Sequence, residues 1–67
     1  MKHYDITIIG SYQLYTRFKK KFKNRLKILF VERFRNSIQT EDGYVIVFSK
    51  EKKNIQISTD ILIRLDT

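Results

Sequence analysis

The chain has 67 residues, no cysteine and one histidine, and its fourteen Lys and Arg side chains outnumber seven Asp and Glu side chains. A chain of this length forms one small domain, residues 1–67. The absence of cysteine excludes disulfides and thiolate metal sites, and two glycines exclude a glycine-rich phosphate loop, so we expect no metal and no cofactor. The longest apolar run, residues 44–48, is too short to span a membrane, so we expect a cytoplasmic protein without a membrane span.

The first predicted element is a strand at residues 4–9. Tyr4, Ile6 and Ile8 alternate there with polar residues, a period of two that is typical of a strand with one buried face. The strand ends at a glycine, and the next residue, Ser11, is a favourable N-cap for a helix. The pattern therefore predicts a half-buried strand that leads directly into a helix.

An amphipathic helix is predicted over residues 12–25, because the apolar period changes to 3.6 at this point. The apolar face carries Leu14, Tyr15, Phe18, Phe22, Leu26 and Leu29. The opposite face carries Arg17, Lys20, Lys21, Lys23, Asn24 and Lys27. One face of this helix is thus expected to pack on the core, while the other is strongly basic.

The end of the helix is marked poorly, because no glycine or proline lies between the helix and Gly43. We expect a break near residues 24–27, since Asn24 tolerates the left-handed conformation that closes helices. A second strand would then run from about residue 28 to residue 38. The alternative is a single helix that continues to about Asn36.

The second half of the chain reads as strands joined by turns. Asp-Gly within residues 40–43 is a hairpin signal, and residues 44–48 are apolar on both faces, as in a central strand. Residues 51–54 form the next turn, and a further strand begins at Ile55. Residues 59–66 fit either a continuation of that strand or a short helix.

Together these elements predict a small α+β domain with the order β-α-β-β-β. We expect a three- to four-stranded, mainly antiparallel sheet with one amphipathic helix on one face. A single helix covers one sheet face only, so apolar surface should be left over on the other. We therefore expect a homodimer, or a protein partner that covers this face.

The positive charge is concentrated in the first half of the chain. Residues 1–35 contain ten Lys and Arg residues against two acids, whereas residues 36–67 contain four against five acids. Helices that merely face solvent usually interleave Glu with Lys to form stabilising pairs, and this helix does not. The asymmetry favours a polyanionic partner, although a basic helix face that only keeps the domain soluble is the alternative.

The candidate nucleic-acid contacts lie on two predicted elements. The helix face would contact phosphates through Arg17, Lys20, Lys21, Lys23 and Lys27. Arg33 and Arg35 would share one face of the second strand, opposite Phe34, and could contact phosphates or bases. The alternative for these two arginines is an edge strand that charge protects from aggregation.

We therefore expect a non-enzymatic protein that binds DNA or RNA, such as a regulator or accessory factor of a phage, plasmid or other mobile element. The second hypothesis is an inhibitor or adaptor that docks on an acidic host protein. No catalytic group is expected, because His3 lies near the terminus without a predictable partner and the sequence places no base beside any of the four serines. Peripheral membrane binding would expose Phe18 and Phe22 to lipid and is disfavoured.

Overall fold

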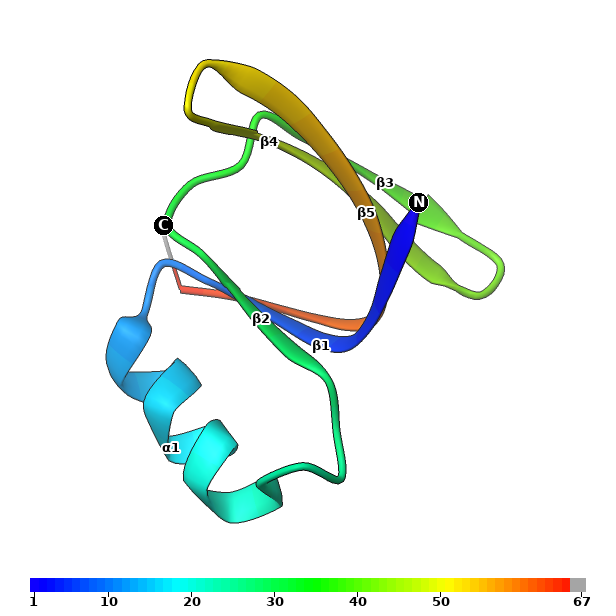
Figure 1. Cartoon of the computed structure of the whole chain (residues 1–67). Helices are drawn as coiled ribbons and strands as arrows, with labels where there is room; N and C mark the ends of the chain where they lie inside the picture. The colour runs from blue at the N-terminus through cyan, green and yellow to red at the C-terminus, as the bar shows by residue number, and fades with distance from the viewer. Residues whose placement is uncertain (66–67) are drawn as a thin grey trace.

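Five strands and one helix make up the computed structural model, which describes residues 1–65 (Figure 1). In chain order they are β1 (Lys2–Ile9), α1 (Tyr12–Phe22), β2 (Ile28–Val31), β3 (Asn36–Thr40), β4 (Gly43–Lys50) and β5 (Lys53–Arg64). The strands form one sheet in the order β2-β1-β5-β4-β3. β1 runs parallel to β2 and β5, whereas β4 runs antiparallel to β3 and β5.

The predicted α+β class with one helix is confirmed, but the description of the sheet is corrected. The sheet has five strands rather than three or four, and it is mixed rather than mainly antiparallel. The physical reason lies in the segment predicted as one strand, residues 28–38. It forms two strands, β2 and β3, at opposite edges of the sheet, and residues 32–35 connect them.

Helix α1 begins as the sequence predicts and ends earlier. The Ser11 hydroxyl accepts a hydrogen bond from the N–H of Leu14 at 3.2 Å, which confirms the N-cap. The helix ends at Phe22 because Lys23 adopts a φ of 50°, with its N–H bonded to the Lys19 carbonyl at 2.8 Å. The predicted break is confirmed and the long helix is wrong, although the residue with a positive φ is Lys23 rather than Asn24, and its ψ of −120° differs from that of the left-handed helical conformation.

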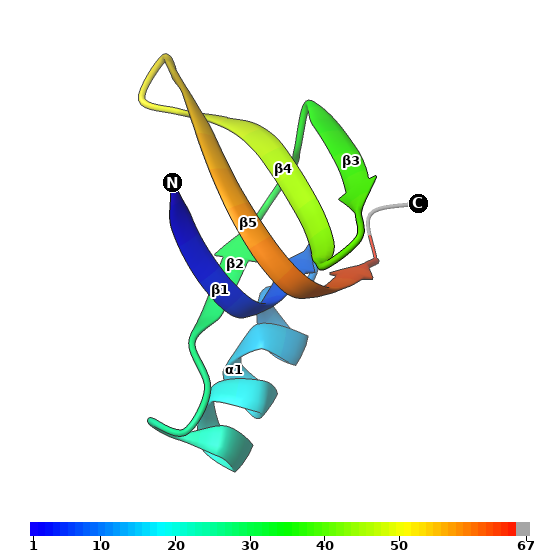
Figure 2. The same ribbon diagram turned by 90° about the vertical axis from the view of Figure 1, so that its right-hand side faces the viewer.

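Strand β5 joins the two halves of the sheet, because it is long enough to pair with a different neighbour along each half. Residues 53–59 pair with β4, and residues 57–64 pair with β1. The sheet bends between these halves, so β3 and β4 curve back over β1 and β2 (Figure 2). The strand alternative for residues 59–66 is thus confirmed as far as Arg64, and the last residue of that range lies outside the described residues.

The concave side of the bent sheet encloses one hydrophobic core. Its buried members come from four strands, namely Ile9, Val31, Ile46, Phe48 and Ile57. The sheet itself therefore buries the inward face of β4, which needs no second layer. Much of the apolar surface that was expected to be left over therefore lies inside the bend. The argument for a homodimer from that surface is weakened, and the homodimer stays a prediction.

A second core lies between the sheet and the helix. Ile6, Ile8 and Ile28 are buried there beneath half-buried side chains of α1, among them Leu14 and Phe18. Strand β1 is therefore buried on both faces from residue 6 to residue 9, and the half-buried strand predicted from its alternation is corrected. The helix covers only this side of β1 and β2 (Figure 1).

A local irregularity in β1 explains how its side chains reach both cores. The N–H groups of Asp5 and Ile6 both donate to the carbonyl of Lys27, at 2.8 and 3.3 Å. Two successive donors on one acceptor are characteristic of a β-bulge. Tyr4 consequently packs in the concave core while Ile6 packs beneath α1, although an unbroken strand would place both on the same face.

The two hairpins use different turn conformations. In the β3–β4 hairpin the loop residues are Glu41 and Asp42, and Gly43 begins β4 with a φ of 135°. A Cβ atom on Gly43 would lie 2.2 Å from the Thr59 carbonyl oxygen, so glycine is required there.

No helix among residues 1–65 is long and apolar enough to cross a membrane.

Candidate functional site

The exposed basic face of α1 and of the turn that follows it is the first candidate site. It is formed by Arg17, Lys19, Lys20, Lys21, Lys23 and Arg25, which we call the helix surface. All six side chains are exposed, and residues 12–27 contain no acid. Within residues 1–65, none of the six forms an ion pair with a carboxylate. Their charge is therefore not neutralised by the fold.

Neighbouring groups orient three of these cations without cancelling their charge. Lys19 Nζ lies 5.6 Å from the ring centroid of Tyr15, and Lys21 Nζ lies 5.7 Å from that of Phe22. The guanidinium of Arg25 donates to the Lys21 carbonyl at 3.2 Å, near the negative end of the helix dipole. Rings and carbonyls hold the side chains along the helix and leave their outer sides open to an anion.

Lys27 was predicted on this face but belongs to a different environment, because α1 ends before it. Its Nζ lies 5.0 Å from the ring centroid of Tyr4. Its N–H donates to the Asp5 carboxylate at 2.7 Å. Lys27 thus fastens the start of β2 to β1, and its charge lies over a ring of the concave side.

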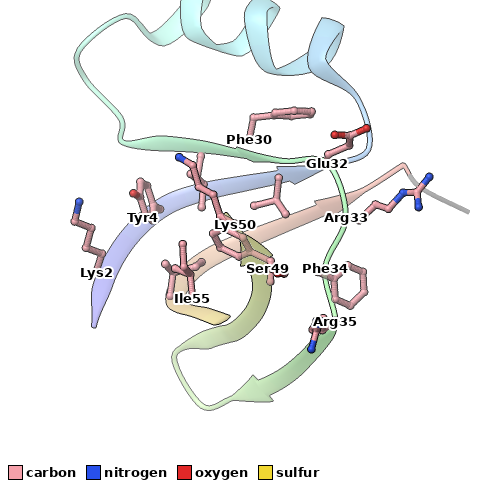
Figure 3. A pocket seen from close by; sticks show the side chains of 14 residues that line it. Lys2, Tyr4, Phe30, Glu32, Arg33, Phe34, Arg35, Ser49, Lys50 and Ile55 are labelled. Atoms are coloured by element: carbon pink, nitrogen blue, oxygen red, sulfur yellow. The ribbon is translucent and has the colours of Figure 1, made fainter. Parts of the chain in front are cut away.

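A cleft on the concave side is the second candidate site (Figure 3). It has a volume of about 1010 Å³ and lies between the segment 29–35 and the β4–β5 hairpin. Its apolar lining comes mainly from Leu29, Phe48, Ile55 and Ile57, and its polar lining includes Lys2, Glu32, Arg33, Arg35, Ser49 and Lys50. Four cations and one carboxylate therefore line an otherwise largely apolar cleft.

The cleft contains Arg33 and Arg35, which the sequence placed on one face of a strand opposite Phe34. That arrangement is corrected, because residues 32–35 are not a strand and all three residues line the cleft. The backbone N–H of Arg35 donates to the Val47 carbonyl at 2.7 Å, where the connection joins β3. The edge-strand explanation for these arginines no longer applies to their positions.

The two basic surfaces lie on opposite faces of the sheet. Helix α1 packs against the core formed by Ile6, Ile8 and Ile28, while the cleft opens onto the core that contains Phe48 and Ile57. The structure brings Arg17, Lys20, Lys21 and Lys23 together, as predicted, and adds Lys19 and Arg25. It separates Arg33 and Arg35 from them, because these two arginines line the cleft on the other side of the sheet.

Sequence reasoning missed three cations near the cleft. Lys2 and Lys50 line it, and the Arg64 guanidinium lies 4.4 Å from the ring centroid of Phe34, which also lines it. These residues are far apart in the chain, and no local pattern links them. The pairing of β1 and β4 with β5 brings them together, and that pairing was not predicted.

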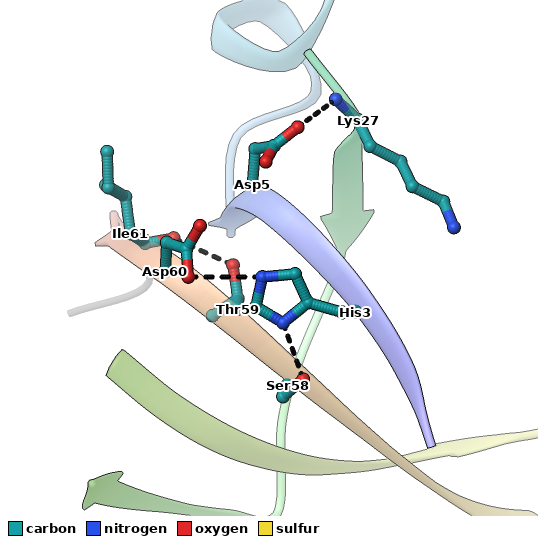
Figure 4. A network of polar contacts seen from close by, with 7 residues as sticks. All are labelled: His3, Asp5, Lys27, Ser58, Thr59, Asp60 and Ile61. Carbon is teal, nitrogen blue, oxygen red and sulfur yellow. Dashed lines mark hydrogen bonds and ion pairs between the residues drawn. The ribbon is translucent and has the colours of Figure 1, made fainter. Parts of the chain in front are cut away.

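A third group of polar side chains connects β1 and β5 (Figure 4). His3 Nδ1 lies 2.7 Å from the Ser58 hydroxyl, and His3 Nε2 lies 3.1 Å from a carboxylate oxygen of Asp60. His3 and Ser58 are register partners, which explains the contact. The sequence predicted neither a partner for His3 nor a base beside a serine, and the structure provides both here.

This group contains the three residue types of a serine hydrolase triad. Its surroundings differ from those of a hydrolase active site in the substrate cleft and the oxyanion donors. None of the three residues lines the cleft, and the side chains of His3 and Asp60 are 51% and 52% exposed. Acyl transfer also needs N–H donors aimed at the developing oxyanion. Within residues 1–65 the one helix N-terminus follows the far end of β1, about 20 Å along the strand from His3. What the structure shows is a link between β1 and β5 through these side chains.

Comparisons of the chain with protein-family models, with curated proteins and with solved structures found no match.

Proposed function

We propose that this protein binds duplex nucleic acid, DNA or RNA, without catalysing a reaction, and that the helix surface provides its phosphate contacts. The observation that carries the proposal is the set of six exposed cations on α1 and its following turn, with no acid among residues 12–27. Like charges at this density repel one another, so the arrangement costs stability unless a polyanion neutralises it.

The dimensions of the helix surface fit a row of phosphates. Helix α1 has 11 residues and is therefore about 16 Å long. Duplex DNA carries one negative charge for about every 1.7 Å of its axis, so several phosphates lie within reach of such a helix. The contacts would be made to the backbone and not to base edges, which gives binding with little sequence preference.

The proposal assigns the phosphate contacts to the helix surface alone. Lys27 lies over Tyr4, and Arg33 and Arg35 line the cleft on the other side of the sheet. A straight duplex lying along α1 cannot also reach that side. These three residues of the predicted set are therefore not part of the proposed duplex interface.

The test is fluorescence anisotropy with a labelled duplex of about 20 base pairs at about 50 mM salt, where phosphate contacts are strong. The variant K20Q/K21Q removes two charges from the centre of the helix surface. K52Q/K53Q removes the same charge from the β4–β5 turn and is the matched control. We expect the first variant to bind roughly a hundredfold more weakly at this salt concentration and the control to bind nearly as the wild type does. Absence of binding by the wild type, or equal loss in both variants, would contradict the proposal.

A further inference from the structure

The cleft is bordered by an exposed strand edge as well as by side chains. Strand β2 lies at the end of the sheet, and within residues 1–65 its outer edge has no strand partner. Residues 29–31, the last three of β2, all line the cleft, as do residues 32–35, which follow the strand. In a strand, alternate side chains point to opposite faces, so three consecutive lining residues mean that the backbone of β2 itself borders the cleft.

Phe30 shows most directly that the backbone of β2 borders the cleft. Its ring packs on the helix side, 5.3 Å from the ring centroid of Tyr12 and 5.8 Å from that of Tyr15, and Figure 3 places it on the side of β2 away from the labelled Tyr4 and Lys50. Phe30 nevertheless lines the cleft, so its backbone does so.

The direction of the backbone groups follows from the contacts that β2 makes with β1. The carbonyls of Lys27 and Val31 accept hydrogen bonds from β1 and from Gly10, so odd-numbered residues point toward β1. Backbone groups alternate in direction along a strand that is paired on one side. The N–H and C=O groups of Ile28 and Phe30 therefore point outward.

The lining of the cleft favours an anionic partner with apolar side chains. Lys2, Arg33, Arg35 and Lys50 contribute four positive charges, and Glu32 is the one carboxylate among the lining residues. Leu29, Phe48, Ile55 and Ile57 provide the apolar part. An extended peptide that carries both aliphatic and acidic residues on one face matches both features, because only one face of an added strand enters the cleft.

The aromatic rings of the cleft do not favour nucleic acid. Tyr4 is covered by Lys27 Nζ at 5.0 Å, Phe34 by the Arg64 guanidinium at 4.4 Å, and Phe48 is only 9% exposed. Base stacking needs an uncovered ring face, and a cation already lies over Tyr4 and over Phe34 while Phe48 is buried. An outward strand edge, by contrast, is used by a peptide and not by a nucleic-acid backbone.

We propose that the cleft binds an extended acidic segment of a partner protein, which adds a strand to the outer edge of β2. Its aliphatic side chains lie on Leu29, Ile55 and Ile57, and its carboxylates lie near Lys2, Lys50 and Arg35. Because β2 has four residues, the paired part of the segment is short, about 13 Å. This site is separate from the helix surface and does not depend on the proposed binding of nucleic acid.

The first experiment uses an acetylated peptide of two repeats of Val-Gln-Glu-Gln, here called the Val-Glu peptide, which carries valine and glutamate on the same strand face. It is added to isotope-labelled protein and followed by backbone NMR. We expect the amide signals of Ile28 and Phe30 to shift and their hydrogen exchange to slow, while signals of residues 17–21 stay in place. Two further peptides carry N-methyl groups on every valine and glutamate or on every glutamine. One of them should lose binding, because N-methylation removes the donors on one edge of the peptide. Equal binding by both would overturn the proposal.

Charge is tested with a Val-Gln peptide and with two protein variants. We expect K2Q/K50Q to bind the Val-Glu peptide roughly fivefold to tenfold more weakly, as the loss of two exposed ion pairs implies. K20Q/K21Q, the matched control on the helix surface, should bind it as the wild type does. The proposal fails if the Val-Gln peptide binds equally well, or if no shift is seen at about 1 mM Val-Glu peptide. It also fails if single-stranded oligothymidylate, and not the peptide, shifts the signals of residues 28–35.

Discussion

The Asp5 carboxylate accepts a hydrogen bond from the N–H of Lys27 at 2.7 Å, and the Lys27 carbonyl accepts one from the N–H of Asp5 at 2.8 Å. This reciprocal pair fastens the segment after α1 to the bulge in β1. The bulge in turn places Tyr4 in the concave core and Ile6 beneath the helix. One polar contact thus supports the division of the fold into two cores, and with it the two opposite basic surfaces.

Replacing Asp5 with alanine should lower the free energy of unfolding by about 1–2 kcal/mol, because the N–H of Lys27 loses its charged acceptor. Asp5→Asn should lower it by less, since an amide oxygen still accepts the bond. Chemical denaturation measures both values. Equal stability of the alanine variant and the wild type would show that the contact does not stabilise the fold.

Thr7 carries a buried hydroxyl whose Oγ1 has no hydrogen-bond partner within residues 1–65, and the residue is 0% exposed. Replacing it with valine removes a desolvated polar atom and keeps the shape. We expect Thr7→Val to raise the free energy of unfolding by about 1 kcal/mol. Thr59→Val is the control, because the Thr59 hydroxyl donates to the Ile61 carbonyl at 3.1 Å. The control should be destabilising, and a loss of stability in both variants would contradict this account of Thr7.

The β4–β5 turn places two residues other than glycine in the left-handed region, Glu51 at a φ of 53° and Lys52 at 65°. Asn-Gly is the preferred pair for a two-residue turn with positive φ at both positions. The variant E51N/K52G should therefore raise the midpoint of thermal unfolding, with a gain of about 1 kcal/mol. The same change at Glu41 and Asp42, which do not have positive φ, should give no gain. A gain at both turns would mean that conformation is not the cause.

The contact of His3 with Ser58 and Asp60 is expected to have no hydrolytic activity, because within residues 1–65 none of the three lines the cleft and the side chains of His3 and Asp60 are about half exposed. Hydrolysis of p-nitrophenyl acetate should proceed at the same rate with the wild type and with Ser58→Ala. A large loss of rate in Ser58→Ala, with His3→Ala equally affected, would instead identify a working triad.

Periodicity predicted the elements in which one pattern dominates. Three patterns each allowed one structural interpretation, and each is confirmed: the 3.6 period of α1, the N-cap at Ser11 and the apolar run of β4. The candidate residues Arg17, Lys20, Lys21 and Lys23 were found on one surface for the same reason, because neighbours on a helix face are set by the local sequence.

Features that depend on contacts between distant segments were not predictable in this way. The segment from Ile28 to Ile38 keeps enough apolar residues for one strand, and only its pairing with β1 at one end and β4 at the other divides it. The bulge at Asp5 depends on the Lys27 carbonyl, 22 residues away. Lys2 and Lys50 meet Arg35 only because the sheet bends, so the cleft had no signal in the sequence.

The most direct test of the central claim, that the helix surface binds duplex phosphates, is the salt dependence of the binding constant. We expect the logarithm of the binding constant for a duplex to fall linearly with the logarithm of salt concentration. For K20Q/K21Q the magnitude of this negative slope should be about 1.8 lower than for the wild type, because each lost phosphate contact removes about 0.9. For K52Q/K53Q the slope should be unchanged. Identical slopes for the wild type and K20Q/K21Q would contradict the claim.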